Sequence, residues 1–143
     1  MSDPFPDLES ALSALDDEDP TLRMAAARRI GLEGPDAASA APALVARLED
    51  ADPMVRAMAA AALGKVGADD ASVVGALVAC FDDGAFPVRF WAAESLGRLP
   101  RAGHGALPAL ERLQRDEHKA VRGAASLAAA RIRGAAGDTR PAS

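Results

Sequence analysis

Acidic and basic side chains recur in this sequence at a fixed spacing. Four arginines stand 33 residues apart, and an aspartate precedes each of them by six residues. The arginines are Arg23, Arg56, Arg89 and Arg122, and the aspartates are Asp17, Asp50, Asp83 and Asp116. A planar guanidinium can donate two parallel hydrogen bonds to one carboxylate. The spacing therefore predicts a structural ladder of Asp–Arg pairs, formed within a unit or across units, rather than a catalytic site.

Other residues that could do chemistry lack a supporting pattern. His104 and His118 have no cysteine or histidine at ligand spacing, which disfavours a zinc site. The acidic runs, such as 16–19, do not match a calcium loop and are interpreted as a solvated edge beside helix N-termini. No Gly-x-Ser-x-Gly motif and no glycine-rich phosphate loop occurs. We expect no catalytic residue, no metal site and no cofactor.

A second periodic set of residues could bind a partner. Positions one, five and nine after each arginine are spaced i, i+4 and i+8, so they share one face of a helix. In unit order they are Met24, Ala57, Phe90 and Gly123, then Arg28, Ala61, Glu94 and Leu127, then Leu32, Lys65, Arg98 and Arg131. Four of these side chains are basic and one is acidic. They predict a cationic groove in a chain of net charge −5.

Two aromatic residues interrupt the regularity of this stripe. Trp91 stands where the other units carry alanine or methionine, and its ring either fills a gap between units or borders a binding site. Phe90 is predicted to be exposed and to anchor a partner, since aromatics and arginine dominate interface hot spots. The predicted partner site consists of Met24, Arg28, Met58, Lys65, Phe90, Trp91, Glu94 and Arg98.

The elements that must position these residues are helices. The chain is rich in alanine, has no tyrosine and contains 3% aromatic residues, which favours closely packed helices over strands. Asp19-Pro20 and Asp52-Pro53 each place an N-cap acid before a proline at the first helical position. A buried face follows at i, i+4 and i+8. The glycines at 31, 64 and 97 are predicted to stop or loosen these helices, with a second breaker three residues later.

A shorter helix precedes each aspartate. These first helices are predicted at 8–15, 42–48, 73–81 and 106–113, with Pro42 and Pro108 in a first turn. The units then cover about 7–34, 35–67, 68–100 and 101–133. Residues 1–6 and 134–143 are predicted to be disordered tails.

The segment Asp52–Gly64 reads Asp-Pro-x-Val-Arg-x-x-Ala-Ala-x-Ala-Leu-Gly and resembles the HEAT repeat, in the short bacterial form first associated with phycobilin lyases. The resemblance covers about 130 residues. The third unit departs from the motif at 85–87, and the fourth departs at 118–120 and 129–130. The resemblance implies an all-α fold, a right-handed α-solenoid of four HEAT-like helix pairs.

The same resemblance implies a non-catalytic scaffold that binds a peptide, helix or loop of a partner protein on its concave face. Two alternatives remain at this stage. One is a bilin lyase or a lyase-associated subunit. The other is nucleic-acid binding through the cationic groove, which the net negative charge disfavours.

Cysteine content and the ends of the chain bear on location. Cys80 is the only cysteine, so no internal disulfide can form, and it is predicted to be a buried hydrophobe. The start of the chain has no signal-peptide pattern, and no apolar run reaches the roughly 18 residues that span a bilayer. We expect a cytoplasmic, bacterial protein that does not bind membranes. Residues around Leu127 could pair two copies, but a monomer is favoured over a homodimer.

Overall fold

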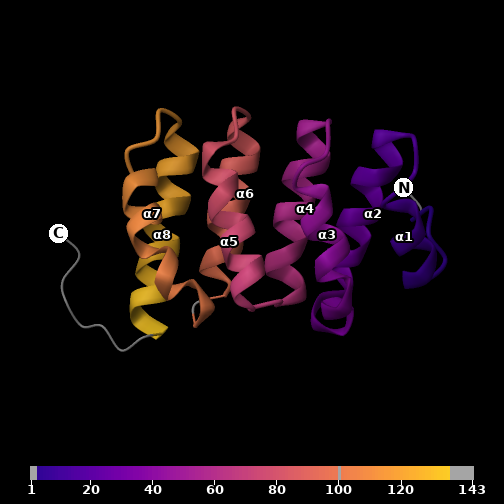
Figure 1. Ribbon diagram of the computed structural model, residues 1–143, viewed down its shortest axis with the longest axis horizontal. Helices are drawn as coiled ribbons and strands as arrows, with labels where there is room; N and C mark the ends of the chain where they lie inside the picture. The colour runs from indigo at the N-terminus through magenta and orange to yellow at the C-terminus, as the bar shows by residue number, and fades with distance from the viewer. Residues whose placement is uncertain (1–2, 100, 136–143) are drawn as a thin grey trace.

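The chain folds into helices that stand side by side in four pairs along one axis (Figure 1). This computed structural model describes residues 3–99 and 101–135. The pairs are α1 (Leu8–Ala14) with α2 (Pro20–Glu33), α3 (Ala41–Arg47) with α4 (Pro53–Val66), α5 (Ala71–Ala79) with α6 (Phe86–Gly97), and α7 (Leu107–Leu113) with α8 (Lys119–Ala135). Short 3₁₀ turns cover Gly34–Ala40, Cys80–Asp82 and Ala102–Ala106. The predicted all-α solenoid of helix pairs is confirmed.

The helix ends follow the predicted capping residues. Asp19 and Asp52 are the N-caps of α2 and α4, and their carboxylates accept backbone hydrogen bonds of 2.9 and 2.8 Å. A proline follows each of them at the start of the helix. Gly34 and Gly67 end the same helices with φ of 68° and 71°, in the region that glycine favours.

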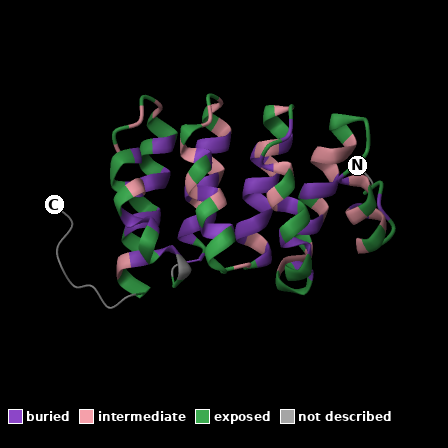
Figure 2. Ribbon diagram, viewed as in Figure 1, coloured by how far each residue is buried: buried purple, intermediate pink, exposed green. Residues whose placement is uncertain are grey.

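The second helix of each pair forms a closely packed layer. Among the second helices, α2 packs closely against α4, α4 against α6, and α6 against α8, whereas α3 and α5 contact each other only lightly. The second helices are therefore the more tightly packed layer of the stack. In Figure 2 the buried segments, drawn in purple, recur along the middle of the row of helices. Leu63 and Leu96, which lie on the predicted buried face, are fully buried there.

The prediction that a glycine stops or loosens the helix is wrong for Gly31 and Gly64, whereas α6 does end at Gly97. The first two lie inside α2 and α4, the third is the last residue of α6, and all are buried. A Cβ built on Gly64 would lie 2.7 Å from the Cα of Ser95, and one on Gly31 would lie 3.2 Å from the Cα of Ala62. A side chain at Gly64 would force the helices to shift, and the contacts at Gly31 and Gly97 are tight, because neighbouring second helices approach backbone to backbone.

The two ends of the described chain depart from the predicted tails. Phe5 is buried in the core, and Asp3 forms an ion pair of 2.6 Å with Arg29. The Phe5 ring and the Asp3 carboxylate therefore hold this segment against the folded helices. Helix α8 continues to Ala135, two residues into the predicted C-terminal tail. The rest of that tail, 136–143, lies outside the described residues.

Candidate functional site

The Asp–Arg ladder forms between consecutive units. Arg56 donates from Nε to Oδ2 of Asp83 at 2.8 Å and from Nη2 to Oδ1 at 3.1 Å. Its Nη1 donates at 2.9 Å to the backbone carbonyl of Asp50, in its own unit. The same pair of carboxylate bonds joins Arg23 to Asp50 and Arg89 to Asp116. Each guanidinium thus ties the turn of one unit to the turn of the next, which is a structural role.

The ladder keeps its aspartates ionised. Hydrogen bonds from Arg89 lower the pKa of the Asp116 carboxyl, against the opposing effect of burial. For Asp50 and Asp83, burial is the largest single influence and raises the pKa. The hydrogen bonds from their arginines and from backbone N–H groups together outweigh it, so the net pKa of both carboxyls is lowered. Both members of each Arg–Asp pair are therefore charged at neutral pH.

Within the described ranges, the outermost members of the ladder have no partner across a unit boundary. Among these residues, the Arg122 guanidinium donates only to the backbone carbonyls of Asp116 and Glu117. In the same part of the chain, the Asp17 carboxylate accepts only from the N–H of Asp19. In the part of the chain that the structure describes, the four arginines and four aspartates thus form three Arg–Asp pairs between units.

The predicted partner stripe lies only partly on the surface. Ala57, directly after the arginine of the second unit, is fully buried, and Ala61 is nearly so. The equivalent residues in α8, Gly123 and Leu127, are exposed, and no described helix follows α8. The position after each arginine therefore faces the next unit, and placing it on the concave surface was wrong because the neighbouring helix covers it.

The exposed face of the second helices lies one position further round. The residues two before and two, five and nine after each arginine are spaced four, three and four apart and so share this face. They are exposed or half-buried, except for Ala61 and Ala124, which are buried. In α4 this face carries Met54, Met58 and Lys65, and in the third unit it carries Trp91 and Glu94 in α6 and Arg98 directly after α6.

Sequence reasoning missed two apolar members of this surface. Met54 is 43% exposed and Leu32 is 64% exposed. The signal for Met54 was present, since it precedes Met58 by one helical turn and so shares its face. Leu32 was placed on the stripe but left out of the predicted partner site.

Phe90 and Trp91 form an aromatic pair at the centre of α6. Their ring centroids are 5.0 Å apart at an interplanar angle of 83°, the edge-to-face arrangement that aromatic rings favour. Both side chains are half-buried and pack on the core. Phe90 is therefore less exposed than predicted, because its position borders the next unit. Trp91 lies on the exposed face with Met58 at the equivalent position of the neighbouring unit.

The remaining members of the predicted site are charged or peripheral. Arg28 and Arg98 are exposed, whereas Lys65 and Glu94 are half-buried. In the described part of the chain, no carboxylate lies within 4.0 Å of the charged groups of Arg28, Lys65, Arg98 or Arg131. Met24, in α2, is half-buried and occupies the position equivalent to Phe90.

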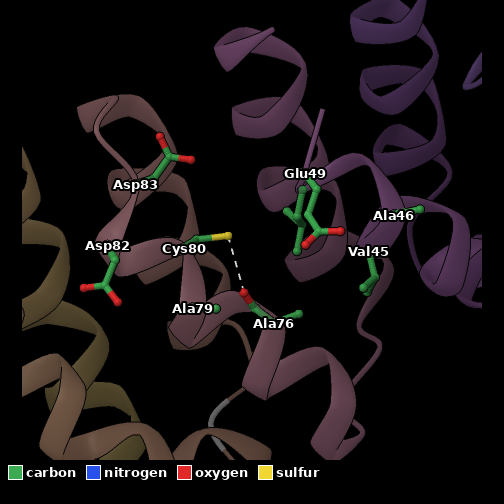
Figure 3. Close-up of a pocket in the computed structure, with 9 residues that line it drawn as sticks. Val45, Ala46, Glu49, Ala76, Ala79, Cys80, Asp82 and Asp83 are labelled. Carbon is green, nitrogen blue, oxygen red and sulfur yellow. Dashed lines mark hydrogen bonds between the residues drawn. The ribbon is translucent and has the colours of Figure 1, made fainter. Parts of the chain in front are cut away.

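A cleft of about 440 Å³ opens between the first helices α3 and α5 (Figure 3). The cleft is open because the third unit has small side chains, Ala79 and Cys80, at this point. One unit further on, Arg112 and Leu113 stand at the equivalent positions of a smaller cleft of about 340 Å³. Glu49 lines the larger cleft from the turn after α3, and Asp82 and Asp83 line it from the third unit.

Cys80 lies in the wall of this cleft and is buried, as predicted. Its Sγ lies 3.4 Å from the carbonyl oxygen of Ala76, in donating distance for a thiol. Burial raises the pKa of the Cys80 thiol to about 11. The thiol is therefore protonated at neutral pH and is a weak nucleophile there.

Across residues 3–99 and 101–135, no cluster of three or more histidine, cysteine, aspartate or glutamate side chains is arranged to hold a metal ion. In the same ranges, no helix combines the length and apolar character that crossing a bilayer requires.

Comparisons with known proteins add to this geometry. The family model described as HEAT repeats matches residues 8–97. Among curated proteins, no sequence matches the chain significantly. The chain is similar to the solved structure of an engineered protein, with a TM-score of 0.75, 22% identity, and coverage of 89% of this chain and 62% of that one.

Two further similar structures contain complexes. One is the complex of CpcE and CpcF of phycocyanin lyase from Nostoc sp. PCC7120, with a TM-score of 0.67, 24% identity, and coverage of 94% and 68%. The other is a designed armadillo repeat protein in complex with the peptide (KR)4, with a TM-score of 0.69, 24% identity, and coverage of 87% and 64%. The chain thus spans 62–68% of the length of these three structures. At these identities the likeness shows the fold alone.

Proposed function

Because this chain belongs to the HEAT-repeat family, whose model matches residues 8–97, we propose that it is a non-catalytic scaffold. Its concave face, formed by α2, α4, α6 and α8, binds a segment of a partner protein. Stacked helix pairs provide an extended concave surface of this kind. The location in the cytoplasm and the monomeric state remain predictions that belong to this proposal.

The observation that carries the proposal is the apolar centre of the concave face. Met54, Met58 and Trp91 come from two adjacent helices and keep part of their side chains accessible. Methionine and tryptophan are enriched at the cores of protein interfaces, methionine because its side chain adapts to different partners. Unpaired cations border this centre, which is the arrangement of an interface with an apolar core and a polar rim.

The similar structures support the proposal only in general terms. One of them is a designed repeat protein in complex with a peptide, and another is a complex of two protein subunits. Repeat proteins of this fold therefore hold peptides and proteins.

A peptide selection tests the proposal. A library of random dodecapeptides is panned against the wild-type chain, and selected peptides are titrated by calorimetry and by fluorescence. Trp91 is the only tryptophan, so its emission reports on the concave face directly. We expect selected peptides to shift this emission and to bind the Met58→Ala, Trp91→Ala double variant at least about tenfold more weakly.

A matched control lies on the other layer of helices. The variant Ala79→Arg fills the cleft between α3 and α5. The fourth unit carries an arginine, Arg112, at the equivalent position, so the fold should tolerate this substitution. Peptides that bind Ala79→Arg more weakly but bind the double variant normally would indicate that the binding site is this cleft. A visible absorbance change on mixing with a phycobilin would instead favour the bilin alternative, and steeply salt-dependent binding of DNA would favour the nucleic-acid alternative.

A further inference from the structure

Three of the positive charges on the concave face form one row, and Arg28 lies apart from that row, five residues after Arg23. Lys65, Arg98 and Arg131 occupy the same position in three consecutive units, nine residues after the ladder arginine. We call these three residues the cationic row. In the part of the chain that the structure describes, none of them has a carboxylate partner within 4.0 Å. Most of the other arginines in that part, such as Arg56 and Arg89, are held by carboxylates.

The glycines of the second helices help to position the cationic row. A Cβ on Gly31 would lie 3.4 Å from Cδ of Lys65, and one on Gly97 would lie 3.7 Å from Cδ of Arg131. The aliphatic stem of each of these two cations therefore rests on the bare backbone of the preceding unit. A stem held in this way loses less conformational entropy when its charged end binds a ligand.

The apolar centre runs parallel to the cationic row. Met58 and Trp91 precede Lys65 and Arg98 by seven residues, which is about 10.5 Å along a helix. Glu94 lies between the two rows in α6, one turn before Arg98. A ligand along this face therefore meets apolar side chains on one side and positive charges on the other.

From this arrangement, and resting on the proposed function, we infer that the partner segment is acidic and extended, with a carboxylate at every third residue facing the cationic row. The charge of the row selects a segment of opposite sign. An aliphatic residue in each triplet packs toward Met58 and Trp91.

The spacing of the second helices decides between an extended and a helical segment. Packed helices lie about 8–10 Å apart, and the glycine contacts place these helices toward the shorter distance. In a polyproline II segment every third side chain returns to the same side after about 9 Å. In an α-helical segment, side chains return to the same face after seven residues, which is about 10.5 Å. This repeat is longer than the spacing of the second helices, so its side chains would fall out of register with the cationic row over successive units.

Three synthetic peptides test the inference. The first consists of four Glu-Pro-Leu triplets, the second has the same composition with its four glutamates grouped at one end, and the third replaces every glutamate with lysine. All are capped at both ends and titrated into the intact chain, with Trp91 emission and calorimetry as readouts. We expect the first peptide to bind at least about tenfold more tightly than the other two.

Variants of the chain locate the binding. Arg98→Glu and Arg131→Glu should each weaken the triplet peptide about tenfold or more, whereas Arg115→Glu, an exposed change away from the row, should not. Glu94→Gln should strengthen binding about two- to threefold, because it removes the acid beside the row. The double variant Arg98→Glu, Arg131→Glu should bind the lysine peptide better than wild type does, which shows that the variant is folded. Helical circular dichroism of each variant provides a second check.

Several results would overturn the inference. Equal affinity for the triplet and grouped peptides would contradict the proposed spacing of one carboxylate every three residues. Equal effects of Arg98→Glu and Arg115→Glu would show that the cationic row does not bind the peptide. Tighter binding of a twelve-nucleotide oligothymidylate than of the triplet peptide would assign the row to nucleic acid. If the triplet peptide fails while library-selected peptides still shift Trp91 emission, this inference fails and the proposed function stands.

Discussion

Gly64 and Ser95 touch backbone to backbone where α4 meets α6. A Cβ on Gly64 would lie 2.7 Å from the Cα of Ser95, and the Ser95 hydroxyl donates a hydrogen bond across the same contact to the carbonyl of Ala60. The second helices can approach this closely only because one of them has no side chain at the point of contact. This contact sets the spacing of the units and therefore the geometry of the concave face.

Gly64→Ala should destabilise the protein by about 1–3 kcal/mol or more, because the added methyl must push two helix backbones apart. Gly123→Ala is the matched control, since Gly123 also lies within a second helix but has open space around its Cα. That change should stabilise the protein by about 0.5–1 kcal/mol, since alanine restricts the unfolded chain. Urea unfolding measures both, and equal effects of the two substitutions would contradict the close contact.

The ladder predicts an order of stability among arginine variants. Arg56→Ala removes two bonds to Asp83 and leaves a largely buried carboxylate unpaired, so we expect a loss of about 1.5–3 kcal/mol. Arg122→Ala removes only bonds to backbone carbonyls and should cost less. Arg101→Ala, away from the ladder, should stay within about 0.5 kcal/mol of wild type. Melting temperatures in the same order are expected, and identical values for Arg56→Ala and Arg101→Ala would rule out a stabilising ladder.

Stability should fall in acid because the ladder carboxyls bind protons more weakly in the folded state. The pKa values of Asp50, Asp83 and Asp116 are lowered by folding, so the unfolded chain takes up protons first as the pH decreases. Their contribution is complete above the unfolded aspartate pKa of about 3.9 and is lost as the pH falls through the lower folded values. Urea unfolding between pH 7 and 3 measures this loss. Asp83→Asn should show a weaker dependence on pH, and an unchanged dependence would argue against the pair.

Cys80 should react very slowly with thiol reagents in the native protein. Its thiol is buried, and its pKa of about 11 leaves only about one molecule in a thousand as thiolate at pH 8. Labelling by an aromatic disulfide should therefore accelerate greatly in denaturant. Rapid labelling without denaturant would show that the cleft between α3 and α5 is more open than the structure indicates.

Phe90→Ala should affect both stability and binding. Loss of the edge-to-face contact with Trp91 should cost about 0.5–1.5 kcal/mol beyond the buried area that is lost, and it should shift the Trp91 emission. If Phe90 contributes to the partner site as predicted, peptide affinity should also fall by about 1–3 kcal/mol. Calorimetry on folded Phe90→Ala separates the two effects, and unchanged affinity would leave Phe90 with a packing role alone.

The sequence alone was sufficient for the architecture of single units. The Asp-Pro starts of α2 and α4 and the periodic buried face of each second helix depend on residues within a few helical turns of one another. Local capping and helical periodicity are short-range effects, so they can be read directly from the order of residues.

Only the tertiary structure decided what happens between units. An arginine could pair with the aspartate six residues before it or with the one 27 residues after it, and the structure selects the latter. The role of Gly64, the burial of Ala57 and the docking of Phe5 depend in the same way on which neighbour covers a helical face. Periodicity shows which residues share a face. How two faces meet depends on the volume and approach of side chains from different units, which the spacing within one helix does not contain.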